Sequence, residues 1–365
     1  MTASNVIIAM DGMDVYSATT DLSGLGTYSL ASDVTWSGTS GRFGSGGITL
    51  NGYGSLTKTI TGSPTELLVS FSYDVPSLSA TVPFLSFLSA SGTESSVSIN
   101  FATQQVLFLN HSGTVIYTSP TLTTGLTAGW HFVEIYALLG GVVSGIATGV
   151  MMISIDGTPA ATVYTAWNTN GAGGAAYSAI SFGTSGSAIG TIDDLIIRNM
   201  TGTVGGSGTT DDSITSYSSP GDTIFFGDGR IYTRSPNADA SPNNGTPESG
   251  TNHYAMVDSL PYNTSDYITM TNTSGQEELY DVASLGATPS SIWAVQVSTI
   301  AEKTDAGAAN LENLLVSGTA TDTGVNNALT TSYQLYRDVF QTDPNTSAAW
   351  TVSGVNAAKI GYKVP

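Results

Sequence analysis

Apolar and polar residues alternate along much of this 365-residue chain with a period of two, which is the period of a β-strand. The clearest cases are LLVSFSY at Leu67–Tyr73 and WHFVEIY at Trp130–Tyr136. The same alternation predicts further strands at Val97–Phe101, Val106–Leu109, Val150–Ile155, Ala179–Phe182 and Leu195–Arg198. Clusters of turn-forming residues, mainly glycine, separate these segments, and strands at this spacing are typical of an antiparallel β-sandwich.

The pattern stops at Thr201–Ser219, a polar stretch without periodicity that predicts a linker or long loop. We expect strands to resume at Thr223–Phe226 and Arg230–Thr233. Ser235–Asn252 is expected to form a long exposed loop, because turn-forming residues dominate it. Helix formers in Glu277–Leu285 predict one or two helical turns. The remaining predicted strands are Asp266–Met270, Ser291–Thr299, Leu311–Val316, Tyr333–Phe340 and Ala357–Lys363.

These breaks predict two domains, residues 1–204 and 221–365, joined by a linker at residues 205–220. Composition indicates a β fold for both, since 40% of residues are apolar, 42 are glycine and only 10% are charged. Exposed helix faces usually carry many long charged side chains, whereas glycine, hydroxyl and β-branched residues suit turns and pleated strands. We therefore expect an all-β protein of two antiparallel β-sandwich domains, with no helix of three turns before residue 276.

The net charge of −19, with only nine Lys and Arg, makes nucleic acid an improbable partner, because such a surface repels phosphate backbones. Acidic residues occur in both halves of the chain. Residues 1–200 hold eleven Asp and Glu against Arg42, Lys58 and Arg198, a charge of −8, which leaves −11 for the rest. This distribution favours solubility and the capture of cations.

The chain contains no cysteine, which fits assembly in a reducing cytoplasm. Its start, Met1–Ser4, lacks a basic region followed by an apolar core, so we expect no signal peptide. The longest apolar stretch, near Ala137–Val143, is interrupted by Gly140 and Gly141 and is too short to span a bilayer. We therefore expect no membrane insertion.

Four segments of the first half resemble, in order and spacing, strands of the concanavalin A-like or laminin-G-like jelly roll. They are RFGSGGITLNGYGSLTK at Arg42–Lys58, GWHFVEIY at Gly129–Tyr136, SIDGTP at Ser154–Pro159 and GTIDDLIIR at Gly190–Arg198. The resemblance covers about residues 1–200 and implies that fold for the first domain.

Other segments resemble structural proteins of tailed bacteriophages. The opening MDGMDVYSATTDL at Met10–Leu22 looks like the start of laminin-G-like proteins encoded among phage structural genes. GDGRIYTRSPNADAS from Gly227, GTNHYAMVD from Gly250, TDAGAANLENLLVSG from Thr304 and the ending from Thr331 to Val364 also look like phage virion proteins. This resemblance implies a virion component with a second jelly-roll domain. In that ending we expect Trp350 to pack into the second core.

Glycoside hydrolysis is the obvious enzymatic alternative for this fold, and it needs a pair of carboxylates. Glucanases of the fold carry an E-x-D-x-x-E strand, and none of the eight glutamates here matches that spacing. Glu134 lies within a predicted strand and is expected to face solvent. The three histidines, His111, His131 and His253, lack the spacing of a metal site. We therefore expect that the chain is not an enzyme.

Structural calcium is the one metal that the sequence suggests, because hard cations prefer clustered carboxylate and carbonyl oxygens. In sandwiches related to the jelly roll, an Asp at the start of the closing strand can hold calcium together with the N-terminal segment. Asp194 matches that position best, with Asp11 as its neighbour. The alternative, which the sequence favours, is that Asp193 and Asp194 cap or flank this strand. No other cofactor is expected.

Glycan binding would use exposed aromatic rings beside amide or carboxylate groups. The candidate residues are Trp167, Tyr177, Tyr254 and Tyr262, all in predicted loops. Because the chain holds seventeen tyrosines, a core or interface role is favoured over a glycan contact for any single one of these rings.

The sequence favours a structural component of a tailed phage particle, such as a head fibre, a decoration protein, or part of a tail fibre or spike. It would be assembled in the host cytoplasm and reside in the virion. Expected partners are other virion proteins of capsid or tail, further copies of the chain in a homo-oligomer with a trimer favoured, and host-surface polysaccharide. A carbohydrate-binding adhesin module is the alternative, and a polysaccharide depolymerase is the third.

Overall fold

The computed structural model describes residues 6–76, 81–122, 125–140, 142–143, 146–147, 149–167, 169, 172–183, 190–201 and 225–365. These residues form antiparallel sheets together with two short α-helices, α1 (Asp21–Gly24) and α2 (Val352–Ala357). The predicted all-β class is confirmed. The chain divides into two compact units, one of residues 1–13 and 28–231 and one of residues 14–27 and 232–365. No helix in the described part of the chain is long and apolar enough to cross a membrane.

The first unit contains a sheet of eight strands, sheet A. Its strands are β1 (Val6–Asp11), β3 (Val34–Ser37), β4 (Gly47–Leu50), β6 (Glu66–Val75), β11 (Gly129–Leu138), β14 (Gly149–Ile155), β15 (Thr158–Trp167) and β17 (Gly190–Asn199). Their order is β15–β14–β11–β6–β17–β4–β3, with β1 paired to β17. A separate short hairpin joins β12 (Val142–Val143) and β13 (Ile146–Ala147).

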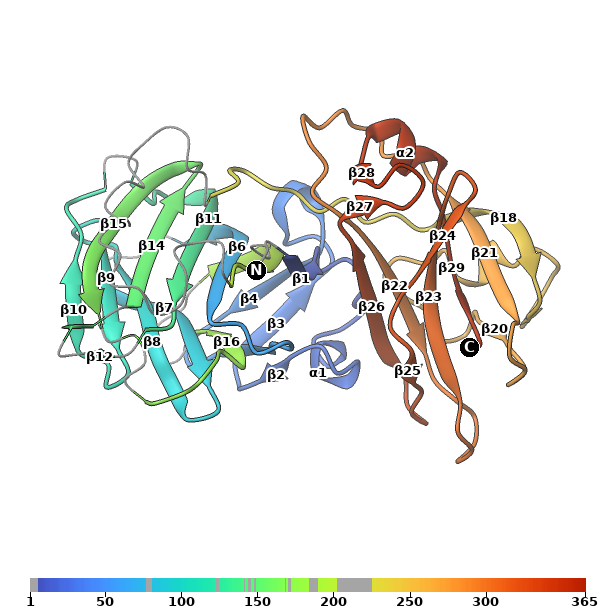
Figure 1. The fold of residues 1–365 in the computed structure, drawn as a ribbon, viewed down its shortest axis with the longest axis horizontal. Helices are drawn as coiled ribbons and strands as arrows, with labels where there is room; N and C mark the ends of the chain where they lie inside the picture. The colour runs from blue at the N-terminus through green and yellow to red at the C-terminus, as the bar shows by residue number, and fades with distance from the viewer. Residues whose placement is uncertain are drawn as a thin grey trace. The chain divides into compact units, whose positions relative to one another are not determined.

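Sheet B forms the second layer of the first unit (Figure 1). It contains β2 (Ser29–Leu30), β5 (Leu56–Thr59), β7 (Thr81–Ser89), β8 (Gly92–Asn100), β9 (Gln105–Asn110), β10 (Val115–Thr118) and β16 (Ala179–Phe182), in the order β10–β9–β8–β7–β16–β5–β2. The core lies between the two sheets. The ring of Phe71 in sheet A is 5.4 Å from that of Phe84 and 4.9 Å from that of Phe182, both in sheet B. The first unit is therefore a β-sandwich.

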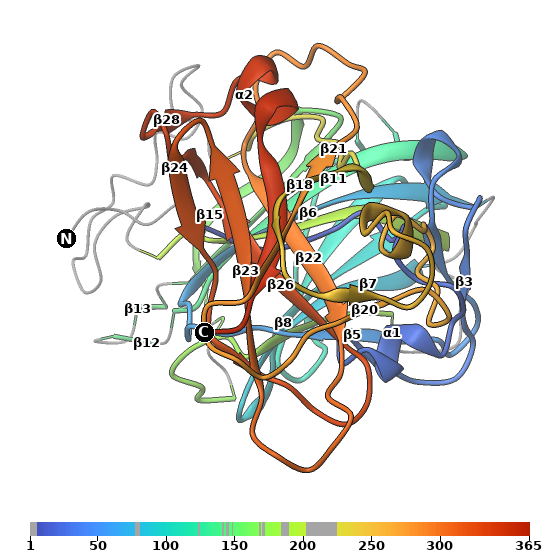
Figure 2. The same ribbon diagram turned by 90° about the vertical axis from the view of Figure 1, so that its right-hand side faces the viewer.

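The second unit contains a larger sheet, in the order β18–β21–β29–β23–β24 with β25 paired to β23, and a two-stranded sheet, β22–β26. The larger sheet contains β18 (Pro236–Asn243), β21 (Glu277–Val282), β23 (Asn310–Ser317), β24 (Ala320–Thr323), β25 (Asn327–Ala328) and β29 (Lys359–Lys363). The smaller one contains β22 (Val295–Ala301) and β26 (Gln334–Phe340). Short pairs join β19 (Thr246–Pro247) to β20 (Ile268–Thr269) and β27 (Thr342–Asp343) to β28 (Ala348–Ala349). Figure 2 shows α2 and β28 at the end of this unit opposite the C-terminus.

The core of the second unit joins its two main sheets. Val297 of β22 and Phe340 of β26 pack with Leu315 of β23 in one buried cluster. Trp350 belongs to the same cluster at 4% exposure, and its Nε1 donates to the carbonyl of Phe340 at 2.9 Å. The prediction that Trp350 enters the second core is confirmed.

Three local predictions for the second half are wrong. The predicted helical turns at Glu277–Leu285 are instead the strand β21, which lies between β18 and β29. The predicted loop at Ser235–Asn252 contains the edge strand β18, where prolines are tolerated because one side of an edge strand makes no ladder bonds. Arg230–Thr233 forms no strand. The linker predicted at residues 205–220 lies outside the described residues.

Residues 14–27, in the first predicted domain, belong to the second compact unit. The backbone N–H of Leu335 donates to the carbonyl of Leu25 at 3.2 Å, and that of Tyr262 to the carbonyl of Val15 at 3.1 Å. The guanidinium of Arg337 donates to the hydroxyl of Tyr16 at 3.1 Å. The second unit is thus built from two separate stretches of the chain.

Candidate functional site

Sheet A carries a buried polar network on the face that points away from the aromatic core. Because side chains alternate along a strand, Phe71 points into the core and its neighbours Ser70 and Ser72 point to the opposite face. Ser70 Oγ donates to Glu134 at 3.4 Å, and Ser72 Oγ donates to Asp194 at 2.9 Å. Glu134 is 1% exposed, so the expectation that it faces solvent is wrong.

The segment at residues 225–231 covers this network. The backbone N–H groups of Phe226 and Gly227 donate to the two carboxylate oxygens of Glu134 at 2.9 and 3.0 Å. The N–H of Ile231 donates to Asp194 Oδ1 at 2.7 Å. Phe225 and Phe226 also pack against a buried apolar cluster that includes Leu68, Tyr136 and Met152. Both carboxylates therefore anchor this segment.

Burial sets the acidity of these groups. Desolvation raises the pKa of Glu134 to about 7, against the N–H bonds from Phe226 and Gly227 that lower it. Desolvation likewise raises the pKa of Asp194 to about 6. It lowers the pKa of Arg198 to about 10, partly offset by the charge of Glu134, and the Arg198 guanidinium lies 3.8 Å from the ring centroid of Phe226. Glu134 and Asp194 therefore titrate at higher pH than exposed carboxyls.

An ion pair and a cation–π contact hold residues 228–230 of this segment. Arg42 donates to both carboxylate oxygens of Asp228, a two-point contact that is stronger than a single one. The Arg230 guanidinium lies 3.9 Å from the ring centroid of Phe43. These contacts hold the segment against the sheet face, so the face is filled by the chain itself.

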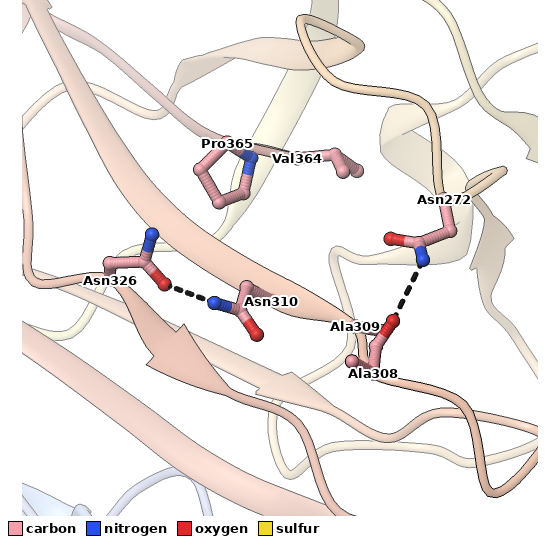
Figure 3. Close-up of a pocket in the computed structure, with 7 residues that line it drawn as sticks. All are labelled: Asn272, Ala308, Ala309, Asn310, Asn326, Val364 and Pro365. Carbon is pink, nitrogen blue, oxygen red and sulfur yellow. Dashed lines mark hydrogen bonds between the residues drawn. The ribbon is translucent and has the colours of Figure 1, made fainter.

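A second polar arrangement lies in the second unit, around a hollow of about 270 Å³ (Figure 3). Three asparagine amides, from Asn272, Asn310 and Asn326, line it together with Ala308, Ala309, Val364 and Pro365. Asn310 begins β23, and Asn326 directly precedes β25, which pairs with β23. Strand pairing therefore brings two of the three amides together.

The third amide and the C-terminal residues are brought to the hollow by backbone bonds. The N–H of Gly275 donates to the carbonyl of Val364, and the N–H of Val364 donates to the carbonyl of Gln276, both at 2.9 Å. Asn272 Nδ2 donates to the carbonyl of Ala308 at 2.8 Å. The hollow is thus formed by loops held to the end of one sheet.

Each amide uses one end of its side chain for a hydrogen bond within the protein. Asn310 Nδ2 donates to Asn326 Oδ1 at 2.6 Å. Among the described residues, Asn326 Nδ2, Asn310 Oδ1 and Asn272 Oδ1 make no hydrogen bond. The hollow therefore offers one amide donor group and two acceptors without a formal charge, a set that matches hydroxyl groups.

The predicted glycan-binding aromatics do not come together at this hollow. Tyr177 is 1% exposed and packs 5.6 Å from the ring of Phe87, so its prediction as an exposed stacking residue is wrong. Tyr254 and Tyr262 are partly buried, and Tyr262 donates to Asp21 at 3.2 Å. The side chain of Trp167 lies outside the described residues, and its role stays a prediction.

The predicted calcium ligands are buried and bound to protein donors. Asp194 accepts the bonds from Ser72 and Ile231 described above and is 3% exposed. Asp11 accepts from the N–H of Met13 at 3.0 Å and from the hydroxyl of Tyr28 at 2.9 Å. In the described ranges, no group of three or more His, Asp or Glu side chains is placed to hold a metal ion. These contacts agree with the alternative that the two aspartates are structural.

Sequence reasoning missed the asparagine hollow. Asparagine is a common turn residue, so Asn272, Asn310 and Asn326 give no signal that separates them from other turn positions. Only the pairing of β23 with β25 and the position of the C-terminus bring them together. The burial of Glu134 was equally hidden, because the residues that cover it are 92 and 93 positions away in sequence.

No protein-family model and no curated protein matches the sequence. The chain is similar in structure to domain 4 of an extracellular arabinanase from Geobacillus stearothermophilus in complex with arabinotriose, with 15% identity and a TM-score of 0.37 over 54% of this chain and 94% of that domain. It is similar to an alginate lyase in complex with alginate trisaccharide, with 14% identity and a TM-score of 0.36 over 55% of this chain and 99% of the lyase. A third is the endo-β-1,4-glucuronan lyase of the fungus Trichoderma reesei, with 14% identity and a TM-score of 0.35 over 53% and 96% of the two chains. Likenesses at this level assign neither a family nor an activity.

Proposed function

We propose that this chain is a non-enzymatic structural protein of a tailed phage particle and that its second unit contacts uncharged host-surface glycans. The observation that carries the glycan contact is the hollow with open amide ends at Asn272, Asn310 and Asn326. Amides bind sugar hydroxyls without requiring a charge on the sugar. The net charge of −19 disfavours acidic polysaccharides, which a surface of the same sign repels.

Binding of neutral oligosaccharides to the intact chain tests this proposal. The variant N326D replaces the donor NH₂ group of Asn326 with a carboxylate oxygen, and the side chain keeps nearly the same size and shape. A lost hydrogen bond is worth about 0.5–1.5 kcal/mol, so N326D and N272A should each weaken binding roughly 2- to 10-fold. The control is N252A, which removes an exposed amide that is not among the residues lining the hollow and should bind like the wild type.

A glycan array reports the outcome, with titration calorimetry on the best neutral sugar. Loss of affinity in N326D and N272A, but not in N252A, supports the proposal. No neutral sugar bound at millimolar concentration, or equal affinity in all variants, contradicts it.

The non-enzymatic part of the proposal is supported by the covered face of sheet A. Glu134 and Asp194 are buried beneath residues 226–231, and each accepts hydrogen bonds from backbone N–H groups of that segment. A glycosidase needs its carboxylates beside the scissile bond. The proposal therefore predicts no release of reducing sugar from host polysaccharide, which a reducing-end assay measures.

A further inference from the structure

Strand β10 forms one edge of sheet B. In the described part of the chain it pairs with β9 and with no other strand. An open edge presents unpaired N–H and C=O groups that can pair with another chain.

The edge of β10 is apolar. Val115 is 46% exposed and Ile116 is 37% exposed. Adjacent side chains of a regular strand point to opposite faces, but the register shifts between Val115 and Tyr117, and both residues before Tyr117 are exposed. Tyr117 stacks on Phe108 with ring centroids 5.8 Å apart, which fixes the strand against β9.

The edge also lacks the charges that usually protect such strands from pairing. Between Glu94 and Asp193 the sequence contains only two charged residues, Glu134 and Asp156. Glu134 is buried, and Asp156 pairs with His131 at 2.8 Å. The turn before β10 carries His111, which is exposed, and no Asp, Glu, Lys or Arg. A charge-free edge contrasts with the net charge of −19.

We propose that β10 is a self-association edge, which pairs with β10 of a second copy of this chain across a two-fold axis. Two chains of charge −19 repel each other, and the repulsion is smallest where both present an uncharged surface. A strongly charged partner would find no complementary charge there. Each copy contributes its own β10 to this contact, so the interface is two-fold symmetric. Such an interface joins two copies and leaves no further β10 edge free for a third. This contact differs from the trimer that the sequence favoured.

Light scattering after size-exclusion chromatography tests the proposal on the intact 37.5 kDa chain. The wild type should elute at twice the chain mass. The double variant V115K/I116K places four ammonium groups in the two-fold contact and should raise the dissociation constant about 100-fold or more, since like charges at an interface cost several kcal/mol. The matched control V325K changes an exposed valine of the second unit and should remain dimeric.

Cross-linking gives a second readout. Because the wild type contains no cysteine, I116C introduces a single thiol per chain. A short bis-maleimide should join two I116C chains in high yield, while V325C should stay uncrosslinked. Circular dichroism verifies that each variant keeps the wild-type fold.

A wild type that is monomeric or trimeric at about 100 μM overturns the proposal, and so does a folded V115K/I116K that remains dimeric. Glycan affinity reports separately on the proposed function, because Asn272, Asn310 and Asn326 lie on β23 and loops of the other unit. A protein that binds glycans but does not dimerise contradicts only the self-association proposal. A protein that dimerises but binds no glycan contradicts only the proposed glycan contact.

Discussion

At the scale of single residues, buried carboxylates in this protein act as anchors for backbone. Glu134 binds Phe226 and Gly227, and Glu94, with 0% exposure, binds the N–H groups of Ala172 and Gly174 at 2.9 Å. A carboxylate is well suited to this because each oxygen accepts hydrogen bonds. For Glu134 the consequence is a folding stability that depends on pH, because burial desolvates its charged form.

Glu134 should make the first unit less stable at neutral pH than at mildly acidic pH. Its pKa rises from 4.5 in the unfolded chain to about 7 in the fold, so the folded state holds the proton more tightly. The resulting stability is fully present below pH 4.5 and is lost as the pH rises through 7. At 1.36 kcal/mol per pKa unit the loss is roughly 3 kcal/mol. Asp194, with a pKa of about 6, acts in the same direction.

Urea unfolding between pH 5 and pH 8 measures this effect. The variant E134Q should flatten the pH dependence, because the amide does not titrate. It should lose about 1 kcal/mol relative to the wild type at the acidic end, since the amide keeps only one acceptor oxygen, and should be more stable than the wild type at pH 8, where the wild type carries the desolvated charge. The control is E248Q, at an exposed glutamate. A pH profile in E134Q identical to that of the wild type would contradict the account of this residue.

At the scale of elements, the segment at residues 14–27 is part of the second unit. Tyr16 and Leu22 are 0% exposed and Leu25 is 3% exposed. Burying such side chains contributes about 1.5–3 kcal/mol each, besides the bonds to Tyr262 and Leu335. A single cut before residue 232 therefore yields a fragment that lacks residues 14–27 and the contacts they make in the second unit.

A fragment of residues 232–365 should consequently fold poorly. Fusing residues 14–27 to its N-terminus through a flexible linker should restore a cooperative thermal transition, which circular dichroism detects. A fusion with the segment in scrambled order is the control for added length. Cooperative melting of residues 232–365 alone, at the temperature of the fusion, would instead show that residues 14–27 are dispensable for the fold of the second unit.

The same elements show what the sequence could and could not predict. The alternation of apolar and polar residues correctly predicted β6, β11 and β14. Each of these strands turns one apolar face into a core, and such a strand has apolar residues at every second position. It failed at Glu277–Val282, where Glu278, Leu279 and Tyr280 are all buried and alternation disappears. Glu278 is tolerated there because it binds His253 at 3.0 Å and Tyr280 at 3.1 Å. Such partners are tertiary and leave no local signal.

At the scale of the whole molecule, the predicted pair of sandwiches agrees with the sheets of the two units, but the compact units do not follow the predicted ranges. Composition indicated the β class because few charged residues and many glycines suit strands and turns. The candidate site could not be predicted, since the hollow depends on how loops near Asn272, Asn310 and Asn326 meet the C-terminus. The scarcity of charge between Glu94 and Asp193 was visible in the sequence, but its meaning depended on the edge position of β10.

The central proposal is that the chain is a structural protein displayed on a phage particle with its glycan-contacting hollow facing outward. The decisive measurement is electron cryo-microscopy of intact particles of the phage whose genome encodes this chain. We predict density for the chain on the outer surface, with Asn272, Asn310 and Asn326 open to solvent. Absence of the chain from purified particles, or burial of that hollow against capsid or tail, would contradict it.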